Sequence, residues 1–204
     1  MAGRRVQNRE ERRGQILAAA RSEFASRGYH ATQISHIVER AGIARGTFYY
    51  HYEGKRQVFA ALLDSILSIV DGNLGQIDPD RPVRVQVVRN IAAMVRILVE
   101  HVDLAHILLE QAVALDEGSN EQLRRFYDRL LSRIEGTIRE GQRIGFLRSG
   151  DPAVISICLI GTVKEVIYQY MLGTRRPPVS TLVREVVGYA LDGIVVAGDP
   201  SPLY

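Results

Sequence analysis

The 204-residue sequence contains a single cysteine, Cys158, which lies in the apolar run AVISICLIG. One cysteine forms no intrachain disulfide, and it does not make a cysteine-based metal cluster. This scarcity favours a reducing, intracellular setting.

Segments that direct a chain to a membrane are also missing. The N-terminal stretch GRRVQNREERRGQ is charged and no apolar segment follows it, which argues against a signal peptide and a twin-arginine export signal. No run approaches the roughly 18 apolar residues that cross a bilayer. We therefore expect a soluble, cytoplasmic protein.

Motifs of the common enzyme classes are absent as well: there is no Gly-rich phosphate loop, nucleophile elbow or Cys–His pairing. His101 and His106 are five residues apart, well over about 100° around a helix, so they do not form the i, i+4 pair of a helical zinc site. Asp103 between them is expected to cap the next helix. We expect no enzymatic activity, no metal site and no cofactor.

Charge is distributed unevenly along the chain. Residues 1–56 carry 11 Lys and Arg against 5 Asp and Glu, a net charge of +6, whereas residues 57–204 carry 15 against 18, a net charge of −3. A basic first quarter on a neutral-to-acidic body indicates a polyanion-binding module, and nucleic acid is the polyanion that fits a chain without membrane signals. The alternative is a solvated basic face without a partner.

Apolar residues recur at helical spacing almost throughout, and no strand alternation, internal repeat or low-complexity tract stands out. The pattern predicts an all-α fold of about nine helices, three short ones followed by six longer ones. The expected helices cover residues 12–27, 33–40, 44–50, 55–70, 82–102, 103–115, 120–145, 153–172 and 179–197.

The first three helices have the pattern of a helix-turn-helix. Thr32 stands just ahead of QISHIVER, where its hydroxyl is expected to cap the second helix. Gly42 is expected to take the left-handed conformation in the tight turn Ala41-Gly42-Ile43, which bulkier residues avoid. Two helices joined by a short turn with glycine, after a helix that completes the core, are typical of this motif.

The third helix and the residues after it suit a DNA major groove. Arg45 can reach a guanine edge or a phosphate, Gly46 lets the backbone approach closely, and Thr47 offers a hydroxyl to a phosphate and a methyl group to thymine. Tyr49 and Tyr50 each present a hydroxyl on a rigid apolar body. His51 and Lys55 extend the set of donors, and Phe48, four residues after Ala44, is expected to point inward.

With these residues in place, the stretch GIARGTFYYHYEGK resembles the recognition-helix motif of the TetR family of bacterial transcription regulators. The resemblance runs from about Arg12 through Phe59, and the long-helix layout of the remainder is also similar. It implies a DNA-binding domain over residues 1–54 and a helical effector-binding and dimerisation domain over residues 55–204. It further implies that Thr32 caps the second helix and contacts phosphate, that Lys55 grips a phosphate, and that the DNA-facing surface consists of Arg45, Gly46, Thr47, Tyr49, Tyr50 and His51.

Several positions have a second interpretation. Ala44 departs from the serine or threonine that the family often has, so one cap or phosphate bond is missing there. His51 is either a DNA contact or a cap of its own helix, and Tyr52 is expected to pack between the two domains. The arginines Arg4, Arg5 and Arg9 are interpreted as a disordered arm that adds nonspecific charge, with minor-groove entry as the alternative.

The helical body has more apolar positions than one buried stripe needs, which is consistent with a cavity for an apolar or amphipathic ligand. By analogy with similar proteins, the expected lining residues are Met94, Leu98, Ile107, Gln111, Tyr127, Lys164 and Tyr168. Lys164 is one of only two lysines in the chain, and it either meets an anionic ligand or pairs with a nearby acid.

Small residues in the last two expected helices permit close packing across a two-fold axis, namely Gly161, Gly188, Ala190 and Gly193. The sequence therefore predicts a ligand-responsive regulator, a repressor that binds a near-palindromic operator as a homodimer. The rival interpretation is a DNA-bound scaffold that recruits a protein partner without a small-molecule effector, and activation in place of repression is a third possibility.

Overall fold

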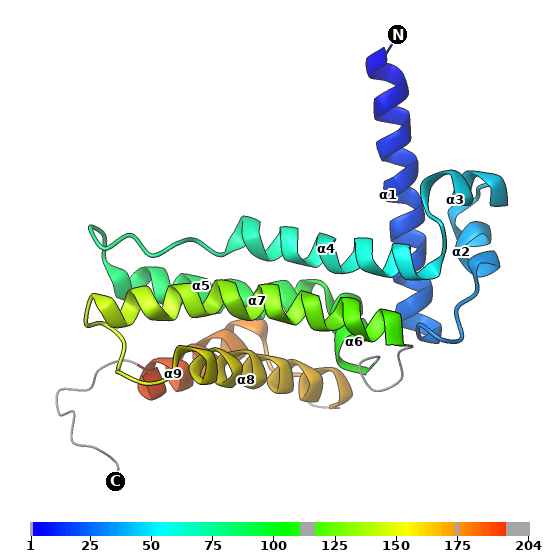
Figure 1. Cartoon of the computed structure of the whole chain (residues 1–204). Helices are drawn as coiled ribbons and strands as arrows, with labels where there is room; N and C mark the ends of the chain where they lie inside the picture. The colour runs from blue at the N-terminus through cyan, green and yellow to red at the C-terminus, as the bar shows by residue number, and fades with distance from the viewer. Residues whose placement is uncertain (1, 111–116, 174–175, 195–204) are drawn as a thin grey trace. The chain divides into compact units, whose positions relative to one another are not determined.

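The computed structural model describes residues 2–110, 117–173 and 176–194, and within these ranges the chain consists of nine α-helices without a strand (Figure 1). The helices are α1 Ala2–Arg27, α2 Ile34–Ala41, α3 Arg45–His51, α4 Lys55–Asn73, α5 Val83–Glu100, α6 Val102–Glu110, α7 Glu117–Arg143, α8 Pro152–Leu172 and α9 Val179–Ile194. The all-α prediction is confirmed.

The first helix starts earlier than expected. Helix α1 has 26 residues and begins at Ala2 instead of near Arg12, because its first residues lack an apolar face but include several good helix formers such as Arg, Gln and Glu. The interpretation of Arg4, Arg5 and Arg9 as a disordered arm is therefore wrong for the backbone, which is helical. Helix α6 is described through Glu110, and residues 111–115 of the expected helix lie outside the described residues.

The chain divides into two compact units. One comprises Met1–Leu67 and Asp103–Phe126, and the other comprises Ser68–Val102 and Tyr127–Tyr204. Helices α4 and α7 each contribute residues to both units. The functional boundary expected after residue 54 stays a prediction.

The core of the first unit begins with the inner face of α1. Ile16, Ala20 and Phe24 are fully buried, as their helical spacing predicts. The ring of Phe24 lies 5.3 Å from that of Tyr29 and 6.3 Å from that of Phe59, measured between centroids. These rings hold the end of α1 against the beginning of α4.

The turn between α2 and α3 forms as predicted. Gly42 has φ 62° and ψ 37°, the left-handed conformation, and its backbone N–H bonds to the carbonyl of Glu39. The N–H of Ile43 donates to the carbonyl of Val38 at 3.2 Å. This closes the C-terminus of α2 in the manner of a Schellman cap and directs the chain into α3.

The second unit has its own apolar cluster, in which α5 packs against α8 and α9. The cluster contains Ile77, Val87, Ala92, Val187 and Leu191. Helix α8 begins with a side-chain cap: one carboxylate oxygen of Asp151 accepts hydrogen bonds from the backbone N–H groups of Ala153 and Val154, and Pro152 occupies the first helical position.

Helix α8 changes one expectation. By length and composition it is apolar enough to cross a membrane, so the statement that no segment approaches this limit is wrong. A single such helix is weak evidence for a span, because a core helix of a soluble protein meets the same criteria. Several of its large apolar side chains are exposed, among them Val154, Ile157 and Leu172.

Candidate nucleic-acid interface

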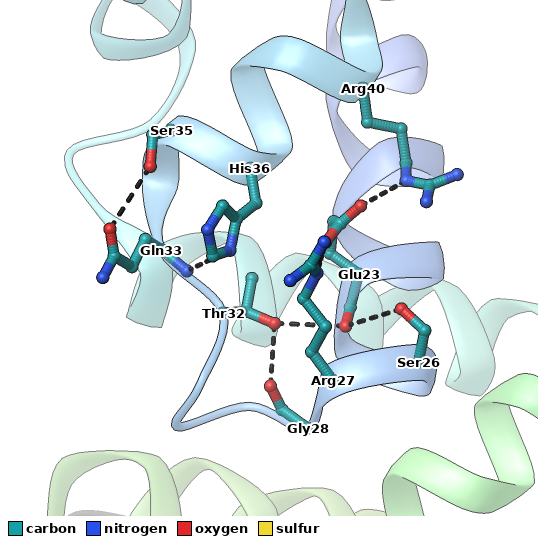
Figure 2. A network of polar contacts seen from close by, with 9 residues as sticks. All are labelled: Glu23, Ser26, Arg27, Gly28, Thr32, Gln33, Ser35, His36 and Arg40. Atoms are coloured by element: carbon teal, nitrogen blue, oxygen red, sulfur yellow. Dashed lines mark hydrogen bonds and ion pairs between the residues drawn. The ribbon is translucent and has the colours of Figure 1, made fainter.

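A buried carboxylate fixes α2 on α1 (Figure 2). Glu23 is only 3% exposed, and its Oε2 accepts a hydrogen bond from Arg27 Nε at 2.7 Å, while its Oε1 accepts one from Arg40 Nε. The hydrogen bond from Arg40 is the largest influence on the pKa of Glu23 and outweighs the opposing effect of burial, so that with Arg27 the pKa lies below its ordinary value of 4.5. Because Arg40 belongs to α2, the carboxylate joins the two helices.

Thr32 does not cap α2, contrary to the expectation. Its side chain is buried, and its hydroxyl donates to the carbonyls of Gly28 at 2.7 Å and Glu23 at 3.1 Å, near the end of α1 (Figure 2). The residue at the start of α2 is instead Gln33, whose backbone N–H donates to His36 Nδ1 at 3.3 Å. The Thr32 hydroxyl is therefore bonded inward in the free protein, and a contact of Thr32 with phosphate stays a prediction.

Two buried aromatic side chains anchor α3, one within the helix and one directly after it. Phe48 is fully buried, as predicted, and Tyr52 is 1% exposed, their ring centroids 6.1 Å apart. The inward position of Phe48 leaves the opposite side of this seven-residue helix facing outward. Ala44, at the N-cap, makes no side-chain cap bond, which agrees with the missing hydroxyl noted in the sequence.

The outward side of α3 carries the residues expected to face DNA. Arg45 and Gly46 are exposed, Tyr49 is 46% exposed and Tyr50 is 70% exposed. A Cβ atom added at Gly46 would meet nothing within 4 Å. Thr47, like His51, is partly buried. The structure thus brings together an open glycine, an arginine and two tyrosines on one short helix.

Each of the two exposed tyrosines of α3 makes a cation–π contact with an arginine. The guanidinium carbon of Arg45 lies 5.7 Å from the centroid of the Tyr49 ring, and Arg45 Nη2 donates to the Tyr49 hydroxyl at 3.4 Å. The guanidinium carbon of Arg9, a residue of α1, lies 5.6 Å from the centroid of the Tyr50 ring. Cation–π contacts of this kind hold a charge near the surface without removing it.

A third such pair was not anticipated from the sequence. The guanidinium of Arg13 lies 5.1 Å from the centroid of the Tyr52 ring, and burial, opposed by Arg13, raises the pKa of the Tyr52 phenol. Arg9 and Arg13 are four residues apart and share one face of α1. That spacing was the available signal, and it becomes visible only when the helix is extended before residue 12.

His51 follows the exposed tyrosines, and its ring lies 5.1 Å from that of Tyr50. Burial is the largest influence that lowers the pKa of His51, and the charges of Arg9 and Arg13 lower it further from its ordinary value of 6.5. His51 is therefore neutral at pH 7 in the free protein, and its imidazole adds a hydrogen-bonding group to the surface without a charge.

Lys55 lies at the beginning of α4, where its ammonium group faces the segment between α1 and α2. Nζ donates to the carbonyl oxygens of Tyr29 at 2.6 Å, Thr32 at 3.0 Å and His30 at 3.2 Å. The side chain is partly buried. These contacts are to backbone groups of the same unit, whereas the resemblance leads to the expectation of a phosphate.

A second ion pair of this unit joins α1 to α6. Both carboxylate oxygens of Asp103 accept hydrogen bonds from the guanidinium of Arg21. Burial by itself would raise the pKa of Asp103, but the bonds and charge of Arg21 outweigh it, so the pKa lies below its ordinary value of 3.8. An open hollow of about 590 Å³ adjoins the pair, lined by Ala18, Arg21, Ser22, Ala25, Ser26 and Asp103.

The residues expected to line an effector cavity lie in both units. Met94, Leu98, Tyr127 and Tyr168 are partly buried in the second unit, and burial raises the pKa of Tyr127. Ile107 is buried in the first unit, Lys164 is exposed on α8, and Gln111 lies outside the described residues. Their role as a binding site stays a prediction.

The chain matches two family models over separate ranges. Residues 16–62 match the model of bacterial regulatory proteins of the tetR family. Residues 80–171 match the model of a tetracyclin repressor-like C-terminal domain. Together the two matches span most of the described helices, including α2, α3 and α5 in full.

Individual relatives agree with these matches over nearly the whole length. YdgC of Bacillus subtilis (strain 168), an uncharacterised HTH-type transcriptional regulator, is 25% identical over 199 residues, which cover 93% of this chain and 95% of YdgC. The fatty acid degradation regulator FadR from Bacillus halodurans has a similar structure, with a TM-score of 0.79 at 22% identity over 89% of this chain and 95% of FadR. SmeT, solved as a complex with triclosan, has a TM-score of 0.75 at 25% identity over 95% of this chain and 99% of SmeT.

Proposed function

Because the chain belongs to the TetR family of bacterial regulatory proteins, we propose that it is a ligand-responsive repressor of transcription. In this proposal it binds a near-palindromic operator as a homodimer and is released by a small apolar or amphipathic effector. It acts in the cytoplasm, where its operator lies.

The observation that carries the DNA-binding role is the outward side of α3. Phe48 anchors the helix from beneath, so Arg45, Gly46, Thr47 and the tyrosine hydroxyls are free to enter a major groove. Arg45 is assigned to a guanine edge or a phosphate, and Thr47 to a phosphate or a thymine methyl group. Tyr49, Tyr50 and His51 complete the surface.

Exposed apolar residues on the last two helices support the dimer. Val154, Ile157 and Leu172 of α8 are each more than half exposed, and Tyr189 of α9 is 70% exposed. A second copy that covers this surface would present two recognition helices, and half-sites about 34–36 Å apart on DNA match such a pair. Gly161, Gly188 and Gly193 leave open space where a Cβ would lie, whereas Ala190 is buried within its own unit.

An effector acts only through its different affinity for two conformers of the protein. A coupling free energy of about 1–3 kcal/mol would change operator affinity by roughly 5–150-fold. The complex of SmeT with triclosan, a small apolar compound, supports an effector of this class. We assign the binding of such a compound to the second unit, where Met94, Leu98, Tyr127 and Tyr168 are partly buried.

The substitution Gly46→Ala tests DNA contact separately from folding. Nothing lies within 4 Å of the added Cβ, and alanine favours a helix over glycine by about 0.5–1 kcal/mol. The free energy of unfolding should therefore stay the same or increase. Operator affinity should decrease, because the methyl group occupies space that the DNA needs.

The operator for this test is selected by the wild-type protein from a pool of random duplexes, and affinities are measured by fluorescence anisotropy. Gly136→Ala is the matched control, since Gly136 is an exposed glycine of α7 whose Cβ would also meet nothing. It should alter stability in the same direction and leave affinity unchanged. If Gly46→Ala binds the operator as tightly as the wild type, α3 does not contact the DNA as proposed. If the wild-type protein enriches no sequence from the pool, the proposed function as a transcription regulator is wrong.

A further inference from the structure

The buried stripe of α1 changes its chemistry toward the N-terminus of the helix. Ile16, Ala20 and Phe24 on this stripe are fully buried. Arg13 and Arg9 continue the stripe at the same helical spacing, and both are exposed. Helix α1 runs on past α3 toward its N-terminus (Figure 1). One face of α1 therefore supplies core residues from Ile16 onward and cationic residues before it.

Both arginines contact aromatic residues at the end of α3. The guanidinium carbon of Arg9 lies 5.6 Å from the centroid of the Tyr50 ring, and that of Arg13 lies 5.1 Å from the centroid of the Tyr52 ring. The two rings differ in exposure, because Tyr52 is buried whereas Tyr50 is exposed. Arg13 therefore packs on a residue of the core, and Arg9 lies at the surface together with an exposed residue of α3.

Arginines of the first unit are held in two different ways. Arg21, Arg27 and Arg40 form ion pairs with carboxylates, so their charge is compensated within the unit. In the ranges that the structure describes, Arg9 and Arg45 form no such pair, and each contacts a tyrosine ring instead. An aromatic ring attracts a cation without neutralising it. The positive charge of these two residues is thus left for an anion from outside the unit.

The neighbouring histidine responds to the same positive charge. Burial is the largest influence that lowers the pKa of His51, and the charges of Arg9 and Arg13 lower it further. A place that disfavours one more positive charge favours an anion. Duplex DNA is the anion that fits here, because phosphates line both edges of a major groove and a recognition helix inserts between them.

We propose that the beginning of α1 belongs to the DNA-binding surface, where Arg9 binds a backbone phosphate beside the groove that α3 enters and the Tyr50 ring positions the Arg9 guanidinium. This inference rests on the proposed function. It differs from the interpretation of the first arginines as nonspecific charge, because it assigns the contact to one side chain with a fixed neighbour.

The variants Arg9→Gln and Arg12→Gln separate a positioned contact from general positive charge. Each removes one charge from an exposed side chain of α1, but Arg12 donates to Gln15 of its own helix at 2.9 Å. Glutamine and arginine have similar helix propensities, so neither variant should alter the melting temperature. Arg9→Gln should weaken operator binding roughly eightfold per subunit at about 0.1 M salt, and it should reduce the slope of log affinity against log salt by about 0.9 per subunit.

Arg12→Gln is the matched control and should stay close to the wild type in both affinity and slope. Two results would overturn the proposal. If Arg12→Gln loses as much as Arg9→Gln, charge at any position of α1 is sufficient. If Arg9→Gln keeps the affinity and the slope of the wild type, Arg9 does not contact a phosphate.

The role of the ring is tested by measuring the effect of Arg9→Gln in three backgrounds. Tyr50→Phe keeps the ring and removes the hydroxyl, whereas Tyr50→Leu removes the ring. If Tyr50 positions Arg9, Arg9→Gln should weaken binding by the same factor in the wild type and in Tyr50→Phe, and by a smaller factor in Tyr50→Leu. The same factor in all three backgrounds would show that the ring does not position the guanidinium.

These experiments distinguish failure of the inference from failure of the proposed function. Weakened binding by Gly46→Ala together with undiminished binding by Arg9→Gln would refute the inference and leave the regulator intact. If the wild-type protein selects no operator, the proposed function is wrong, but both arginine variants can still be compared on a duplex of mixed sequence, because a phosphate contact carries no sequence information. The same difference in salt slope is expected there, and equal slopes would overturn the inference.

Discussion

Removal of the two arginines that hold Glu23 should destabilise the protein by more than the sum of the single removals. Arg27 is four residues from Glu23 on α1, whereas Arg40 is 17 residues away on α2. Both arginine side chains are about half exposed, at 54% and 47%, and the Glu23 side chain is 4% exposed. The acid is therefore the buried partner of both pairs.

The magnitudes follow from this geometry. Arg27→Ala removes a pair within one helix, worth about 0.3–0.5 kcal/mol. Arg40→Ala should cost about 1–2 kcal/mol, because a hydrogen bond to a charged group contributes about 1.5–3 kcal/mol and the exposure of Arg40 reduces that value. The double variant leaves a buried carboxylate without a guanidinium, which costs about 3–5 kcal/mol. The coupling between the two sites should thus be about 2 kcal/mol.

The pH dependence should change sign in the double variant. In the wild type the folded pKa of Glu23 lies below 4.5, so its contribution to stability is present above pH 4.5 and is lost as pH falls through the folded pKa. Without the arginines only burial remains, and burial raises the pKa of a carboxyl group. Protonation then favours the folded state, and the deficit of the double variant should shrink as pH decreases.

Urea unfolding at pH 7, 5.5 and 4 measures these differences. Arg124→Ala is the matched control, since Arg124 forms an Arg–Glu pair with Glu121 on the exposed surface of α7, and it should show no measurable change. Additive losses with an unchanged pH dependence would refute the reasoning, because they would show that water solvates Glu23 once the arginines are removed.

Two further substitutions test the DNA-binding dimer. If Arg45 reads a guanine, Arg45→Ala should weaken operator binding by about 1–3 kcal/mol and relax specificity at one base position. Competition with operator variants that differ at single bases measures this loss. An equal loss of affinity for every variant would make Arg45 a phosphate contact. Ile157→Glu places a charge on the exposed apolar side of α8, so it should shift the protein from dimer toward monomer in sedimentation experiments. If the dimer keeps its stability, the two-fold interface lies elsewhere.

Local patterns were sufficient for most of the helices. The left-handed Gly42, the buried faces of Ile16 and Phe24, and the inward position of Phe48 all follow from spacing and backbone chemistry that act within a few residues. The start of α1 was missed because its first turns have no apolar face. Helix propensity alone, without periodicity, is a weak signal.

The candidate site was less predictable, because its contacts join residues far apart in the sequence. Thr32 has the chemistry of an N-cap for α2, but its hydroxyl bonds backward to Glu23 and Gly28. Lys55 finds its partners 23 to 26 residues away. Sequence spacing does not reveal which of two polar groups a side chain will choose when both lie within reach.

The aromatic residues of α3 and its end have two separate tasks. Phe48 and Tyr52 are buried and support the helix, whereas Tyr49 and Tyr50 are exposed and support arginines. An exposed cation–π contact is worth only about 0.5–1 kcal/mol, which limits the freedom of a guanidinium without fixing it.

A side chain that is already near its bound position loses less conformational entropy when it binds. The small energy of each contact also lets the arginine leave the ring when a base edge or a phosphate offers a stronger hydrogen bond. The tyrosines thus limit the positions of the Arg9 and Arg45 guanidinium groups in the free protein, and under the proposed function both groups would remain available to a base edge or a phosphate.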